Sequence, residues 1–138
     1  MSDPLPVFGP PPSLEDIAAL AQGALVALPP GLARHVRDVV VMVEERADAE
    51  TLDGMGMESA WELTGLYHGT PLTERSSSGT ARPPDMIFLF REAILLEWIE
   101  TGEDLPRLVR SVVVHEVAHH FGFSDAAIEA IERDLEGG

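Results

Sequence analysis

The stretch from residue 105 to 121 constrains the fold more than any other part of the chain. Apolar residues recur there at helical spacing and cover nearly the whole circumference, which predicts a helix that is largely buried. Gly122 follows directly and suits the end of such a helix. Three polar side chains interrupt the apolar pattern near this end, namely His115, Glu116 and His119. A buried helix tolerates such side chains only where they have partners.

The spacing of these residues is the spacing of a zinc site. His115 and His119 lie one helical turn apart, so both imidazoles can face a single point, as two ligands of a zinc ion must. Glu116 is rotated by about 100° from His115 and can reach a water held there without binding the ion. Gly122 permits a sharp turn, which places Asp125 to supply a third ligand. The pattern predicts a catalytic zinc site with Glu116 as general base.

Each of these residues also has an interpretation without a metal. Two histidines can lie in a core if they are hydrogen-bonded, since an unpaired polar group there costs roughly 1–3 kcal/mol. Glu116 can be an acid on the helix surface, and Asp125 can be only the cap of a last helix. His120 is rotated by about 100° from His119, which favours packing or support of a ligand over binding to the same ion.

Composition favours one domain without thiol chemistry. The chain has 138 residues and no cysteine, so disulfides and thiolate metal sites are excluded, and His, Asp and Glu are the strong ligands left. Residues 1–12 contain five prolines and predict a flexible tail. We expect a single domain over residues 13–138.

The charge of the chain argues against nucleic acid as a partner. Acidic residues number 24 against 9 basic ones, for a net charge of −15, and no basic stripe that would bind phosphates is visible. The first residues lack the features of a secretion signal. The longest apolar stretches are far shorter than the roughly 20 residues that span a bilayer. We therefore expect a cytoplasmic protein with no membrane partner.

The rest of the chain predicts a mixture of helices and short strands. Helices are expected over 14–28, over 58–63 and from residue 124 or 125 onward. Strands are expected over 36–43, 66–72 and 86–90. Polar and glycine-rich composition predicts loops over 44–57 and 73–84. Residues 93–99 fit either a continuation of the third strand or the start of a helix.

Three stretches of the sequence resemble a known family. HEVAHHFGFSD (115–125) looks like the extended zinc signature HExxHxxGxxD of zincin metallopeptidases. Together with GLYHGTPLTERS (65–76) and PPDMIFLFR (83–91), it resembles the small bacterial minimal zincins. The likeness covers most of the chain from about residue 13. It implies a compact α+β core, in which a small mixed sheet packs against helices that include the metal-binding HExxH helix.

The resemblance also implies an activity and the residues that carry it. His115, His119 and Asp125 match the zinc ligands, and Glu116 matches the general base. The implied cofactor is Zn²⁺ and the implied substrate is a peptide or protein. Larger zincins have a methionine turn after the third ligand, whereas every methionine here precedes Asp125. Only 13 residues follow Asp125, and we expect no room there for a C-terminal substrate subdomain.

Three functions remain open on the sequence. The first is a zinc-dependent metallopeptidase that hydrolyses peptide bonds through a metal-activated water. The second is a non-catalytic or regulatory zinc-binding module, favoured by the short chain and the missing methionine turn. The third is an RNA-cutting metalloenzyme, against which Glu116 and the negative charge both argue. Tyr67 and His68 can each donate a hydrogen bond to a developing oxyanion or serve only as strand residues. The oligomeric state is left open.

Overall fold

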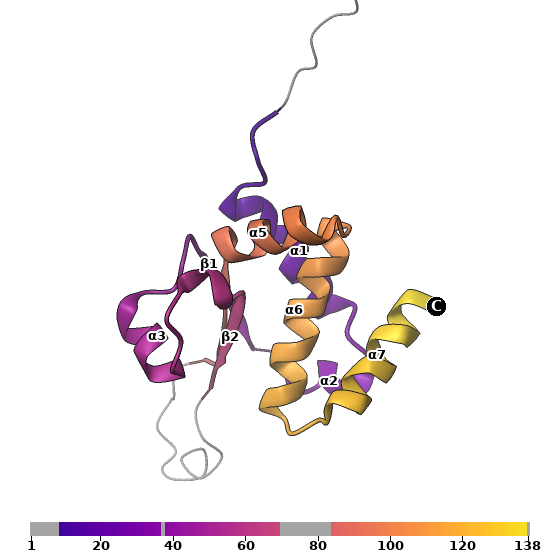
Figure 1. Ribbon diagram of the computed structural model, residues 1–138. Coiled ribbons are helices and arrows are strands. Elements are labelled where there is room, and N and C mark those ends of the chain that lie inside the picture. Colours follow the sequence, from indigo (N-terminus) through magenta and orange to yellow (C-terminus); the bar gives the residue numbers. More distant parts are fainter. Residues whose placement is uncertain (1–8, 37, 70–83, 138) are drawn as a thin grey trace, which may run out of the picture.

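The computed structural model describes residues 9–36, 38–69 and 84–137 (Figure 1). The expected tail over residues 1–12 and the expected loop over 73–84 therefore lie largely outside the described residues. The division of the chain into a tail and one domain stays a prediction.

A three-stranded mixed sheet forms the centre of the described chain, with the strand order β1-β3-β2. Strand β1 (Val40–Glu44) runs parallel to β3 (Met86–Phe90), and β2 (Gly65–His68) pairs with β3 in the antiparallel sense. Helix α1 (Leu14–Val26) packs beside β1, and α6 (Leu105–His120) packs beside α1 and β2. This arrangement confirms the expected α+β class, with a small mixed sheet packed against helices.

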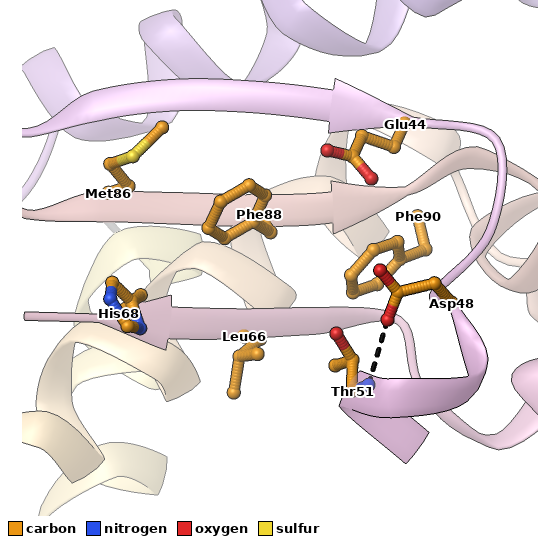
Figure 2. A pocket seen from close by; sticks show the side chains of 8 residues that line it. All are labelled: Glu44, Asp48, Thr51, Leu66, His68, Met86, Phe88 and Phe90. Carbon is orange, nitrogen blue, oxygen red and sulfur yellow. Dashed lines mark hydrogen bonds between the residues drawn. The ribbon is translucent and has the colours of Figure 1, made fainter. Parts of the chain in front are cut away.

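Side chains of the sheet alternate between its two faces. Ile87 and Leu89 of β3 are fully buried in the main core, together with residues of α1 and α6. Phe88 and Phe90 belong to the opposite face, where Phe90 is buried in a second, smaller cluster. This opposite face is hollowed into a pocket of about 420 Å³. Figure 2 shows its lining, which consists of side chains from all three strands together with Asp48 and Thr51.

Helix α1 begins where the sequence predicts. The Ser13 hydroxyl accepts the Asp16 N–H at 3.0 Å, and the Asp16 carboxylate accepts the Ser13 N–H at 2.9 Å. This reciprocal capping box satisfies two backbone donors that a helix start leaves unpaired. The helix ends at Val26, two residues earlier than expected, and Pro30 begins the short helix α2 (Pro30–Ala33).

The expected loop over residues 44–57 is wrong, because it contains helix α3 (Ala49–Met55). The Asp48 side chain caps this helix by accepting the Thr51 N–H at 2.8 Å. Gly56 ends it in the left-handed conformation, with φ of 69°. These end signals outweigh the low helix propensity of the polar and glycine-containing segment between them.

Strand β1 begins at Val40 rather than at residue 36. Its pairing with β3 starts at Val40 opposite Met86. The N–H groups of Val36 and Val39 instead form turn hydrogen bonds to carbonyls three residues earlier. The apolar stretch that begins at residue 36 is therefore longer than the strand, because only the part from Val40 onward pairs with β3.

The other helices agree with the sequence or resolve what it left open. The undecided residues 93–99 are helical, as part of α5 (Arg91–Thr101), which follows β3 directly. The 3-10 helix η1 (Ala60–Glu62) lies within the expected short helix, and α7 (Asp125–Gly137) begins where expected. Within the described ranges, no helix is both long and apolar enough to span a bilayer.

A pair of valines tests the packing of α6. Val113 is fully buried, whereas Val26 of α1 is 86% exposed. We expect Val113→Ala to lower the free energy of unfolding by about 2 kcal/mol, because it removes two buried methyl groups and leaves a cavity. Val26→Ala should change it by less than about 0.5 kcal/mol. Urea denaturation followed by circular dichroism measures both, and equal effects would contradict the burial of this helix face.

Candidate metal centre

Helix α6 buries one face and leaves its polar face open. Seven of its apolar residues are buried, from Leu108 to Ala118. His115 and Glu116 are half-buried and His119 is exposed, all bordering a pocket of about 330 Å³. The expectation of a helix buried nearly all round is therefore wrong at this end. Within the described part of the chain, β2 and α7 contact this polar face but do not cover it, so His119 is exposed and His115 and Glu116 stay partly open to solvent.

The turn after α6 brings Asp125 to this polar face. Gly122 adopts φ of 84°, a conformation that favours glycine, and α7 starts three residues later. The Asp125 Oδ1 atom then lies 3.4 Å from Nε2 of His119. The rings of His115 and His119 have their centroids 6.0 Å apart. The three side chains predicted as ligands are therefore neighbours at the C-terminal end of α6.

The hydrogen bond of His115 determines which ring nitrogen is available. Its Nδ1 atom lies 3.0 Å from the carbonyl oxygen of Ser111, one turn earlier. A carbonyl oxygen can only accept, so this contact requires the proton on Nδ1. The neutral ring then carries its lone pair on Nε2, the atom that can bind a metal ion.

The donor atoms of this cluster fit zinc. Two imidazoles and one carboxylate are a ligand set that leaves a coordination position open for water or substrate. Among the described residues, however, no group of three or more His, Asp or Glu side chains is already arranged to hold a metal ion. The side chains of His119 and Asp125 are 53% and 86% exposed, so they can rotate toward an ion with little steric hindrance.

The carboxyl group of Glu116 is half-buried, whereas the side chain of His119 is exposed. Burial raises the pKa of its carboxyl group, and this effect exceeds the opposing influence of the Tyr67 N–H and of the nearby His119 and His115. Its Oε1 atom accepts the backbone N–H of Tyr67 at 3.1 Å. A carboxylate that is fixed in place and has a raised pKa is suited to accept a proton near neutral pH.

Two glycines let strand β2 approach α6 closely enough for this contact. A Cβ atom on Gly65 would lie 2.7 Å from Cγ1 of Val112 and 3.4 Å from Cγ of Glu116. A Cβ atom on Gly69 would lie 2.9 Å from ring atoms of both Tyr67 and His120. The close packing at these two glycines was not predicted from the sequence.

The neighbouring aromatic residues support the site without joining the ligand cluster. Tyr67 stacks on His120 with ring centroids 3.9 Å apart, and its hydroxyl donates to Asp85 at 2.7 Å. It is therefore the backbone N–H of Tyr67 that reaches Glu116. His68 lines the pocket on the other face of the sheet (Figure 2), which separates it from Glu116.

Comparison with known proteins identifies the family. A family model described as zincin-like metallopeptidase matches residues 36–135, which is most of the chain. This stretch includes the central sheet, α6 and most of α7. No match was found among curated proteins.

A substitution at Gly65 tests the close approach of β2 to α6. We expect Gly65→Ala to destabilise the fold by about 1–3 kcal/mol, because the added methyl group meets Val112. Gly54→Ala is the matched control, since a Cβ atom there meets nothing within 4 Å, and it should be neutral or stabilising by up to about 1 kcal/mol. Thermal and urea unfolding measure both. A neutral Gly65→Ala would contradict this packing.

The raised pKa of Glu116 predicts a pH-dependent stability in the metal-free protein. The folded state retains this proton at pH values where the unfolded chain has released it. Glu116 therefore contributes stability below its unfolded pKa, and the contribution is lost as the pH rises through its folded pKa. We expect Glu116→Gln to gain stability over the wild type as the pH rises from about 4 to 7.

Urea denaturation in the presence of a chelator, at several pH values, measures this gain. Glu58→Gln is the control, because it removes one carboxylate at an exposed position away from the cluster. A difference between Glu116→Gln and the wild type that does not change with pH would show that the carboxyl group is not perturbed.

Proposed function

The chain belongs to the zincin-like metallopeptidase family, and we propose that it hydrolyses peptide bonds with a zinc ion held by His115, His119 and Asp125. One observation carries the proposal. The polar face of α6 presents His115, Glu116 and His119 to one pocket, and the turn at Gly122 adds Asp125 at 3.4 Å from His119.

The three proposed ligands differ in how their binding atoms are positioned. The Nδ1 contact of His115 with the Ser111 carbonyl leaves Nε2 as its binding atom. His119 and Asp125 are exposed at the surface, so their side chains have room to turn toward the same point. Bound zinc supplies a Lewis acid that polarises a peptide carbonyl and lowers the pKa of water.

Glu116 acts as the general base in this proposal. Its Oε1 atom is held by the Tyr67 N–H, and its other oxygen has no hydrogen-bond partner among the described residues. The carboxylate takes a proton from the attacking water as the new carbon–oxygen bond forms. It then passes that proton to the amide nitrogen as the carbon–nitrogen bond breaks, so the base is regenerated.

The net charge of the chain favours some classes of substrate over others. The chain carries a net charge of −15, which attracts basic peptides and repels phosphate-bearing polymers. We therefore propose peptide or protein segments of neutral to basic character as substrates. The RNA-cutting alternative is disfavoured on the same ground.

The exposure of the ligands favours a second candidate function. With Asp125 86% exposed, the site is shallow and no described segment closes over it. A zinc-binding module that recognises peptides without cleaving them would need the same ligands but not Glu116. The general base therefore separates the two functions.

Zinc content and peptide cleavage test the proposal together. We expect the wild type to bind one zinc ion per chain and to cleave unstructured peptides. Glu116→Gln should keep the zinc and lose at least about 100-fold in kcat/KM, because it removes the proton acceptor. His119→Ala should lose most zinc binding, because it removes a ligand. Metal analysis by mass spectrometry and peptide hydrolysis monitored by chromatography measure these effects.

His68→Ala is the matched control, since it removes a histidine on the opposite face of the sheet and should bind zinc and cleave like the wild type. A protein that takes up no zinc would refute the proposed site. A zinc-loaded wild type that binds peptides without cleaving them would instead support the non-catalytic module.

A further inference from the structure

We propose that Glu132 of α7 is a positioning residue, which holds the His115 imidazole for metal binding and strengthens the zinc site. This inference rests on the zinc site proposed above. The Oε1 atom of Glu132 lies 3.3 Å from Nδ1 of His115 and accepts the Ser111 hydroxyl at 2.7 Å. One oxygen of Glu132 therefore contacts both the His115 ring and the Ser111 hydroxyl of α6.

The side of the ring that Glu132 contacts shows what it does. Its carboxylate faces Nδ1, whereas the lone pair that can bind an ion is on Nε2. Glu132 therefore lies at the nitrogen that does not bind the ion, and its contact with His115 does not make it a further zinc ligand. A carboxylate beside the N–H of a metal-binding histidine fixes the orientation of the ring and makes it a stronger ligand.

The environment of Glu132 distinguishes it from the many acids on the surface. Its side chain is only 24% exposed, although it belongs to a helix with several solvent-facing carboxylates. A carboxylate removed from water to this extent requires polar partners. Ser111 and His115 provide them, both from the polar side of α6.

Glu132 is also the middle contact in a series that joins α7 to α6. Glu136 lies 2.5 Å from Arg107 and 3.7 Å from Arg110, near the start of α6. Asp125 lies 3.4 Å from His119 at the other end. The carboxylates of α7 thus meet α6 in reverse order along the chain, as expected for an antiparallel helix pair.

This series sets the register of α7. Because Asp125, Glu132 and Glu136 belong to one rigid helix, the contacts of the last two help to define where the first one lies. Buried Ile128 holds the same helix to the core between them. Glu132 consequently supports two proposed ligands, His115 by direct contact and Asp125 through the position of α7.

Two substitutions separate the charge of Glu132 from its volume. Glu132→Gln keeps the size and an oxygen that can accept the Ser111 hydroxyl, but removes the negative charge. Glu132→Ala removes both. Asp134→Asn is the control, because it removes one exposed carboxylate from the same helix. Competition with a chelator measures zinc affinity, and ¹H–¹⁵N correlation of the imidazoles in the metal-free protein reports the state of each His115 nitrogen.

We expect zinc affinity to fall by about 10- to 100-fold in Glu132→Ala, by less in Glu132→Gln and by less than about twofold in Asp134→Asn. The Nδ1 resonance of His115 should shift in both Glu132 variants and not in the control. If Glu132→Ala does not fold, Glu132→Gln carries the test, because it retains the Ser111 contact. A folded Glu132 variant with wild-type affinity and an unchanged His115 resonance would overturn the inference.

Failure of the proposed function is distinguishable from failure of this inference. A wild type that binds no zinc refutes the zinc site, and the role of Glu132 falls with it. If the wild type binds zinc, and a folded Glu132 variant binds it as tightly with an unchanged His115 resonance, only the role of Glu132 is refuted.

Discussion

The burial of one face of α6 against α1 and the sheet is the contact on which the rest of the structure depends. Val109, Val113, Val114 and Val117 are fully buried there, and the helix cannot rotate without exposing them. Each buried valine stabilises the fold by a few kcal/mol at most, but the four are buried by the same rotation of the helix, so their contributions add to fix that rotation. The rotation that hides the valines is the one that turns His115 outward.

Packing of β2 beside α6 turns this exposed face into a chemical site. Gly65 allows β2 to approach α6, so that the backbone N–H of Tyr67 reaches the Glu116 carboxylate. The same close packing shields part of this carboxylate from solvent. On the other side, α7 presents carboxylates to the histidines. The proposed base and the proposed ligands are therefore supported by different elements, which allows each to be altered separately.

Much of the fold could be predicted from local signals, and the failures have local causes as well. Ser13 and Gly122 mark the ends of α1 and α6 because caps and turns depend on a few adjacent residues. Helix α3 was missed because its caps are strong but its interior is weak. The exposed face of α6 was missed because apolar content indicates how much of a helix is buried, but not which part the neighbouring elements leave uncovered. Glu132 was missed because it is one of 24 acidic residues, although its spacing of seven from Asp125 places both on one side of a helix.

By itself, the sequence determines the chemical groups and their spacing along one helix. Helical geometry alone places His115 and His119 on one side, because this relation depends only on residues one turn apart. Only the tertiary structure decides that this side faces solvent, that Tyr67 holds Glu116 and that Glu132 meets His115. These contacts join elements that are far apart in the chain, and they result from how the whole core packs.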